Sequence, residues 1–286
     1  MESNGTLLDI RNLQVAYRSG NEHNVAVRNM SFALGRERLG IVGESGSGKS
    51  TVGRALLKLL PTARITADKM QFGETDLISA TERQMLAIRG RQMSMILQDP
   101  KFSLNPVHRV GAQIAEAYRV HNRASKADAR ERTLKMLESV QIRDPQRVFD
   151  LYPHEVSGGM GQRIMIAMML IPEPEIIIAD EPTSALDVTV RMQVLNILND
   201  LVTGKGIGLI MISHDLNLVR NFCDRVLVMR SGEVVEECAA RDLANATHPY
   251  TRGLLAAQPH IGGSRGRLPV LNREAIRQPS ISEMQP

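Results

Sequence analysis

The sequence predicts an α/β fold in which helices cover both faces of a mostly parallel β-sheet. Short and almost wholly apolar runs recur at residues 39–42, 176–179, 209–212 and 226–229, as expected for strands that are buried on both sides. Segments with helical spacing of apolar residues separate these runs. A charge-rich stretch over about residues 81–140 has the pattern of amphipathic helices and interrupts the series. Strands that alternate with helices are typical of a parallel sheet, so we expect this architecture with a helical insert.

The first 60 residues are predicted to contain several strands followed by one helix. The helix is expected from about Lys49 to Leu60, because Leu56, Leu59 and Leu60 have helical spacing and Pro61 cannot continue it. The strands are predicted at residues 7–10, 13–17, 25–32 and 39–42.

Helices dominate the rest of the chain between the buried strands. Ser125 and Asp128 are predicted to form a capping box, and Leu134, Leu137 and Val140 lie on the apolar side of the helix that follows. Further helices are predicted at residues 164–171, 188–201 and 215–221. From about residue 261, Gly, Arg and Pro occur without a period, so we expect a flexible extension there.

Composition narrows the class of protein before any motif is considered. The chain has 286 residues, of which 43% are apolar and 23% are charged, and this balance supports a folded core. Its longest apolar run has eight residues, where a membrane span needs roughly 20. Two cysteines and an N-terminus without a secretory pattern indicate a reducing cytoplasm. Only 3% of residues are aromatic and none is Trp, which argues against a nucleic-acid stacking platform despite the net charge of +4.

A glycine-rich loop is the most informative motif. Residues 43–50 fit the pattern G-x-x-x-x-G-K-[ST] and lie between a predicted buried strand and a predicted helix. Glycine permits the backbone to turn successive N–H groups toward a polyphosphate, and the following helix directs its positive end to the same place. A chance match to the pattern in a chain of this length has a probability on the order of 1%. The predicted nucleotide-binding residues are Gly43, Glu44, Ser45, Gly46, Ser47, Gly48, Lys49, Ser50 and Thr51.

Hydrolysis of a nucleotide bound at this loop needs a cation, a metal ligand and a base. Lys49 is expected to reach the β- and γ-phosphate oxygens, and the hydroxyl of Ser50 to bind Mg²⁺. Asp180 and Glu181 end a buried strand, so we predict that Asp180 holds the Mg²⁺ and that Glu181 accepts a proton from the attacking water. His214 ends another apolar strand, which we expect to adjoin the first, and is predicted to contact the γ-phosphate. The alternatives are a solvated Asp-Glu turn and a structural histidine.

With these motifs in place, the chain resembles the nucleotide-binding subunit of ATP-binding cassette (ABC) transporters. The resemblance rests on six motifs in order, ending with Ser157-Gly158-Gly159-Met160, Asp180-Glu181, Ser184-Ala185-Leu186-Asp187 and His214. It implies that Tyr17 stacks on adenine, that Gln98 senses metal and water, and that Asp187 lies at a dimer interface. Val156 and Met160 depart from the commoner signature, whereas its Ser and both Gly are intact.

The resemblance also implies the architecture and the way the motifs work together. The expected fold is a P-loop NTPase with a RecA-like, mostly parallel sheet, an antiparallel β subdomain and a helical subdomain inserted at about residues 88–165. The cassette is expected to cover residues 6–255, with a C-terminal tail at 256–286. In the family, the signature of one subunit (Ser157, Gly158, Gly159 and Met160 here) closes over ATP in the loop of another, so the expected working unit is a dimer.

Local motifs resemble one branch of the family, the dipeptide, oligopeptide and nickel importers. They occupy residues 99–100, 103–106, 152–155, 160–168 and 247–255. The resemblance implies a second homologous ATPase in a heterodimer, two membrane permeases, an extracytoplasmic solute-binding protein and a peripheral position on the cytoplasmic face of the bacterial inner membrane. The chain is more similar to the first ATPase of such pairs, but residues 256–286 contain no Cys, so we predict no iron–sulfur cluster.

Other functions stay open at this point. Peptides are the expected cargo, but a nickel or opine importer has the same motifs, because the permeases and the capture protein choose the solute. A cassette ATPase outside transport would not be expected to carry the 247–255 motif. A regulator that binds ATP without hydrolysing it is disfavoured by intact Glu181 and His214.

Overall fold

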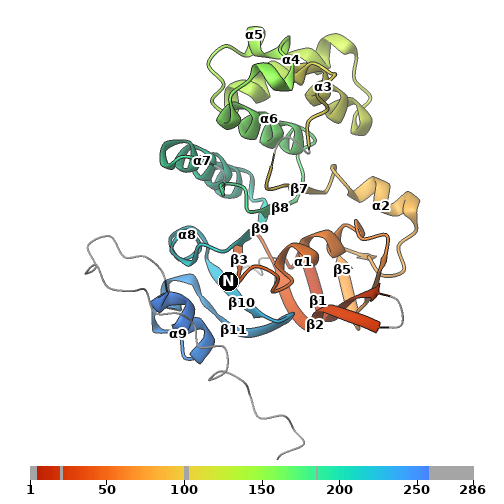
Figure 1. Ribbon diagram of the computed structural model, residues 1–286. Helices are drawn as coiled ribbons and strands as arrows, with labels where there is room; N and C mark the ends of the chain where they lie inside the picture. Colours follow the sequence, from red (N-terminus) through yellow and green to blue (C-terminus); the bar gives the residue numbers. More distant parts are fainter. Residues whose placement is uncertain (1–4, 20–21, 100–102, 185, 258–286) are drawn as a thin grey trace, which may run out of the picture.

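The chain contains two β-sheets (Figure 1), and apolar side chains from both contribute to one hydrophobic cluster. The computed structural model describes residues 5–19, 22–99, 103–184 and 186–257. The larger sheet has the strand order β11-β10-β3-β9-β8-β7, in which β11 alone runs antiparallel to its neighbour. Its strands are β3 (Arg38–Val42), β7 (Met93–Ile96), β8 (Ile176–Asp180), β9 (Gly208–Ser213), β10 (Arg225–Arg230) and β11 (Glu233–Ala239).

Both faces of this parallel sheet are buried, which explains its continuous apolar runs. In β8, Ile176 and Ile178 pack into one hydrophobic cluster, whereas Ile177 and Ala179 pack into another on the opposite face. The predicted strands at residues 39–42, 176–179, 209–212 and 226–229 are confirmed, and together they form the centre of the sheet.

The smaller sheet is antiparallel and is formed mainly by the N-terminal part of the chain. Its strands are β1 (Leu8–Ser19), β2 (Glu22–Leu34), β4 (Ala63–Thr66), β5 (Lys69–Phe72) and β6 (Thr75–Asp76). The two strands predicted at 7–10 and 13–17 are one strand, β1, in which register shifts and a positive φ of 53° at Asn12 bend the chain without ending the pairing. Strands β4 to β6 were not predicted, because they are only two to four residues long.

Helix α1 (Lys49–Leu56) follows β3 and ends earlier than predicted. Lys58 adopts a left-handed φ of 51°, and the N–H groups of Lys58 and Leu59 turn back to the carbonyls of Ala55 and Arg54. The helix therefore terminates through these hydrogen bonds, before Pro61 is reached. The helices around the two sheets are α2 (Glu82–Ile88), α7 (Val188–Lys205), α8 (Leu216–Phe222) and α9 (Pro249–Ala256), with a 3₁₀ helix, η3 (Ala240–Asn245).

A group of helices lies at one end of the molecule, beyond β7 and β8 (Figure 1). It comprises α3 (Val110–His121), α4 (Lys126–Ser139), α5 (Pro145–Phe149), the 3₁₀ helix η2 (Pro153–Glu155) and α6 (Gly158–Leu170). The capping box at the start of α4 is confirmed, because Ser125 Oγ accepts the N–H of Asp128 and the Asp128 carboxylate accepts the N–H of Ser125. The predicted buried helix at 164–171 is the second half of α6, with Ile171 as its C-cap.

One expectation within the charge-rich stretch was wrong. Residues 93–96 were predicted to be helical, but they form β7, the edge strand of the parallel sheet beside β8. All four side chains are buried, and the helical group begins only at Val110. Among the described residues, no helix combines the length and the apolar character needed to cross a bilayer.

Candidate functional site

The glycine-rich loop joins β3, at the middle of the parallel sheet, to α1. Glycine is required where the loop passes close to other backbone. A Cβ on Gly43 would lie 2.2 Å from the carbonyl oxygen of Met229, and one on Gly48 would lie 2.4 Å from that of Ala26. Gly48 also has a φ of 99°, which side chains rarely adopt. These contacts fix the loop against β2 and β10, so its shape is set before any ligand binds.

Lys49 closes the loop from inside. Its ammonium donates hydrogen bonds to the carbonyls of Gly43 (2.8 Å) and Glu44 (2.7 Å), and the residue is only 5% exposed. Burial lowers the pKa of Lys49, while the carboxylates of Glu181, Asp180 and Glu44 act in the opposite direction. A buried cation held on carbonyls at the centre of a concave loop is suited to an anionic ligand.

Asp180 lies at the end of β8 and faces the first turn of α1. The hydroxyl of Ser50 donates to Asp180 Oδ1 at 2.7 Å, and Arg54 Nη2 lies 4.0 Å from Oδ2. Burial raises the pKa of Asp180, and the bond from Ser50 and the charges of Arg54 and Lys49 reduce the shift. Arg54 was not among the predicted site residues, although its spacing of four residues from Ser50 on a helix places the two side chains on the same face.

Glu181 lies between Gln98 and His214. Its Oε1 is 3.0 Å from Nδ1 of His214, and Gln98 Nε2 donates to its Oε2 at 3.3 Å. Glu181 follows β8, Gln98 follows β7 and His214 follows β9. These parallel strands are neighbours in the sheet, so the three residues lie at the same edge, beyond the carboxyl ends of the strands. The expectation that the strand before His214 adjoins the strand before Glu181 is confirmed.

The loop and these strand ends enclose one cavity of about 540 Å³. Lys49, Gln98, Glu181 and His214 all line it, and Ala26 of β2 contributes a wall that no sequence pattern indicated. Its other lining residues are Ser45, Gly46, Gly48, Ser50 and Thr51. Tyr17 is half-buried on β1, in the register position opposite Asn24 and Ala63, and is not among the lining residues.

The signature residues form the start of α6, in the helical group. Ser157 Oγ accepts the N–H of Met160 at 3.3 Å and so caps the helix, and Ser157 and Gly158 are exposed. None of the residues from Ser157 to Met160 lines the cavity at the loop. Asp187 is also exposed and caps α7, because its Oδ1 accepts the N–H of Val190 at 3.0 Å.

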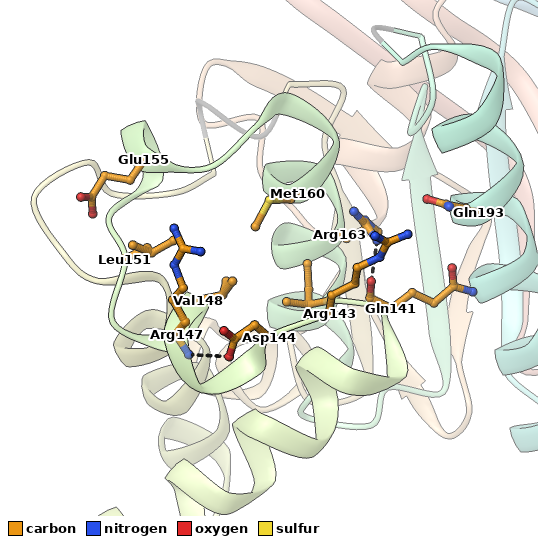
Figure 2. Close-up of a pocket in the computed structure, with 11 residues that line it drawn as sticks. Gln141, Arg143, Asp144, Arg147, Val148, Leu151, Glu155, Met160, Arg163 and Gln193 are labelled. Carbon is orange, nitrogen blue, oxygen red and sulfur yellow. Dashed lines mark hydrogen bonds between the residues drawn. The ribbon is translucent and has the colours of Figure 1, made fainter.

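A second cavity, of about 670 Å³, lies between the α4–α5 connection, α6 and α7 (Figure 2). Met160 lines it together with Arg143, Arg147 and Arg163. The side chain of Met160 therefore lines this second cavity, whereas its backbone N–H donates to Ser157 Oγ at the start of α6. Among the described residues, no group of three or more His, Cys, Asp or Glu side chains is arranged to hold a metal ion.

Comparison with known proteins assigns the chain to a family. The family model described as "ABC transporter" matches residues 27–184. The chain belongs to the ABC transporter family. It is an ATP-binding, ATP-hydrolysing transporter subunit, as the resemblance of its motifs implied.

Relatives of this ABC subunit include several ATP-binding proteins that are named for transport. The probable peptide ABC transporter ATP-binding protein y4tR of Sinorhizobium fredii is 46% identical over 96% of this chain and 84% of its own length. The peptidoglycan transport ATP-binding protein YejF of Agrobacterium fabrum is 46% identical over 88% of this chain and 47% of its own length. The glutathione import ATP-binding protein GsiA of Escherichia coli is 45% identical over 98% of this chain and 47% of its own length. The ABC subunit therefore spans about half the length of the last two.

Solved ABC cassettes have the same fold. The cassette MJ0796, determined as a dimer in a post-hydrolysis state with ADP and Pi, superimposes with a TM-score of 0.74 at 27% identity, covering 82% of this chain and 99% of its own. The protein cbiO1 of Clostridium perfringens, part of the cbiONQ transporter complex, gives a TM-score of 0.72 at 23% identity, covering 84% and 91%, and supports the fold alone. The predicted P-loop NTPase fold is thus confirmed.

Proposed function

We propose that this ABC subunit hydrolyses ATP at a dimer interface to power the import of di- or oligopeptides through separate permease subunits. The convergence of Lys49, Gln98, Glu181 and His214 on one cavity carries the proposal, because it joins a polyphosphate cradle to a base. The cargo follows from the relatives, which are named for peptide, peptidoglycan and glutathione transport. No relative described above is named for nickel or opines, so that alternative is not favoured.

Binding of the triphosphate falls to the loop at residues 43–51. Residues Ser45, Gly46, Gly48 and the start of α1 line the cavity, and Lys49 would exchange carbonyl contacts for phosphate oxygens. Mg²⁺ takes oxygen ligands and keeps several waters, so the hydroxyl of Ser50 and the carboxylate of Asp180, 2.7 Å apart, fit its requirements. When bound, the ion would neutralise charge that develops on the phosphates. Gln98 is proposed to approach the same metal, and Tyr17 to stack on adenine.

Hydrolysis requires a water held in line with the γ-phosphate. We assign Glu181 as the group that accepts a proton from this water as its oxygen bonds to phosphorus and the bond to ADP breaks. His214 and Gln98 hold the two carboxylate oxygens of Glu181 from opposite sides, which fixes the direction in which the base points. His214 is 62% exposed, and we propose that it also contacts the γ-phosphate.

The signature would act on the ATP of another subunit. Ser157, Gly158 and Gly159 present the start of a helix that is suited to an anion but lies away from the cavity of its own chain. We propose that a second, homologous ATPase covers the cavity with its signature and receives this one in return, with Asp187 in the interface. The solved cassette MJ0796 is a dimer, which supports this arrangement.

The remaining proposals concern where the subunit works. The helical group would form the inserted subdomain, with β7 kept in the parallel sheet, and would dock with the region of Gln98 onto two permeases. The subunit would then lie on the cytoplasmic face of the bacterial inner membrane, and an extracytoplasmic protein would deliver the solute. The cassette domain would cover residues 6–255, with the tail at 256–286.

Reconstitution tests the proposal. The chain, its genomic neighbours encoding permeases and a second ATPase, and the solute-binding protein are incorporated into proteoliposomes, and uptake of labelled tripeptide and of nickel is measured with MgATP. We expect tripeptide uptake that Glu181→Gln abolishes. ATP hydrolysis that neither the binding protein nor peptide stimulates, or uptake of nickel alone, would contradict the proposed function.

A further inference from the structure

The motif at residues 247–255 resembles a branch of the family, yet the nucleotide site as described gives it no role. It forms the chain just before α9 and α9 itself. Glu236 of β11 anchors its beginning, because one carboxylate oxygen, Oε1, accepts the N–H of Thr247 (2.7 Å), the hydroxyl of Thr247 (3.2 Å) and the N–H of His248 (3.3 Å). The start of the helix is therefore tied to the parallel sheet at a single carboxylate.

The next residues set the direction of the helix. His248 Nδ1 accepts the N–H of Tyr250 at 3.2 Å and caps α9, and Pro249 occupies its first turn, where a missing N–H costs nothing. Tyr250 is consequently directed inward and is only 2% exposed. The guanidinium of Arg230, at the end of β10, lies 5.3 Å from the centre of its ring.

The hydroxyl of Tyr250 reaches the phosphate-binding loop. It accepts the backbone N–H of Glu44 at 3.2 Å, across 206 positions of sequence. The carbonyl of Gly43, which belongs to the same planar peptide unit as this N–H, accepts Lys49 Nζ at 2.8 Å, and the carbonyl of Glu44 accepts it at 2.7 Å. The backbone at Gly43 and Glu44 is thus hydrogen-bonded to Tyr250 of α9 on one side and to the ammonium of Lys49 on the other. A further support comes from the β10–β11 turn, where the N–H of Gly232 donates to the carbonyl of Ser47 at 3.0 Å.

We infer that Tyr250 is a positioning residue for ATP binding. Its hydroxyl fixes the peptide unit between Gly43 and Glu44 and, through the Gly43 carbonyl, the position of the Lys49 ammonium; it does not line the cavity. The inference rests on the proposed role of the loop as the triphosphate site. It gives the 247–255 motif a purpose within this chain: a capped helix, anchored on Glu236, that delivers one hydroxyl to the loop.

The test removes the hydroxyl and keeps the ring. Tyr250→Phe is compared with Tyr118→Phe, which removes the hydroxyl of a half-buried residue of α3 in the helical group. The loss of one neutral hydrogen bond corresponds to about 2- to 13-fold in an equilibrium. We therefore expect the KM for MgATP to rise within this range in Tyr250→Phe, with kcat little changed. Hydrogen exchange at the Glu44 amide should accelerate, and neither quantity should change in Tyr118→Phe.

Two more variants, Glu236→Gln and Lys49→Ala, distinguish failure of the positioning role from failure of the proposed nucleotide site. Glu236→Gln weakens the anchor of α9, so we expect a smaller increase in KM in the same direction. Unchanged KM and unchanged amide exchange in Tyr250→Phe would overturn the positioning role, as would a loss of stability and kcat with KM unaltered. Lys49→Ala serves as the reference for the site: if it keeps full ATP affinity, the proposed nucleotide site itself is wrong. If it loses affinity while Tyr250→Phe behaves as wild type, only the role of Tyr250 fails.

Discussion

Replacing Glu181 with Gln removes the proposed proton acceptor but keeps the shape and hydrogen bonds of the side chain. The amide has the shape of the carboxylate, accepts the hydrogen bond from Gln98 through its oxygen, and offers an N–H to Nδ1 of His214. What it cannot do is take a proton from water. General-base catalysis contributes roughly 10²- to 10⁴-fold, so we expect kcat to fall by that factor, equivalent to about 2.7–5.4 kcal/mol in the barrier.

Stability should hardly change in the same variant. The pair formed by Glu181 and His214 is partly open to solvent, since the histidine is 62% exposed, and exposed pairs contribute about 0–1 kcal/mol. The predicted loss in rate therefore exceeds any loss in the free energy of unfolding. With turnover blocked and ATP binding intact, the variant should also accumulate as an ATP-bound dimer.

The assay measures phosphate release at saturating MgATP, together with thermal unfolding and size-exclusion chromatography with and without nucleotide. Glu131→Gln is the matched control, because it removes a carboxylate of α4 that pairs with Lys135 and does not line the cavity. It should retain kcat within about tenfold, below the range expected for a base. If Glu181→Gln kept more than about a tenth of wild-type kcat, the assignment of the base would be wrong. Failure to bind ATP would equally contradict the argument that geometry is preserved.

Three further outcomes follow from contacts in the site and the core. Lys49→Ala removes the cation at the centre of the loop and should abolish ATP binding, measured by titration with a fluorescent ATP analogue; retained affinity would exclude the loop. Burial raises the pKa of Asp180 above its ordinary 3.8, so its ionised form costs stability as pH rises through that pKa. Asp180→Asn should therefore melt at a higher temperature than wild type at pH 7 in EDTA, with the difference vanishing near pH 3, while losing ATP hydrolysis. A Cβ on Gly40 would lie 2.2 Å from Val219 Cγ1, so Gly40→Ala should lower the free energy of unfolding in urea by roughly 1–3 kcal/mol. The double variant with Val219→Ala should recover much of the loss, and no recovery would show that the clash lies elsewhere.

The parts of the fold that the sequence predicts well are those with strong local signals. Each central strand of the parallel sheet is a continuous apolar run because both of its faces are buried. The loop at residues 43–51 is recognisable because close contacts with neighbouring strands constrain its glycine positions. Ser125 and Asp128 indicate the start of α4 because the hydrogen bonds of the capping box are made within four residues of sequence.

Features that depend on distant contacts were not accessible in this way. Strand β7 has four residues, two of them Met, which carry no strand signal, and it is a strand only because β8 pairs with it. Helix α1 ends at Leu56 through a left-handed Lys58, whose ammonium donates to the carbonyls of Ile78 and Ala80. The contact between Tyr250 and the loop joins residues 206 positions apart, and no local pattern announces it.

Two adjacent carboxylates serve one site because the strand ends between them. Successive side chains of a β-strand point to opposite faces, so a continuing β8 would send Asp180 and Glu181 to different sides of the sheet. Asp180 is the last residue of β8, and Glu181 turns to a φ of 48° while its N–H donates to the carbonyl of Ile212. This left-handed residue breaks the alternation and brings both charges toward Lys49, whose pKa responds to each of them. A strained backbone at Glu181 is therefore the means by which the proposed metal ligand and the proposed base can be consecutive in sequence and yet both face Lys49.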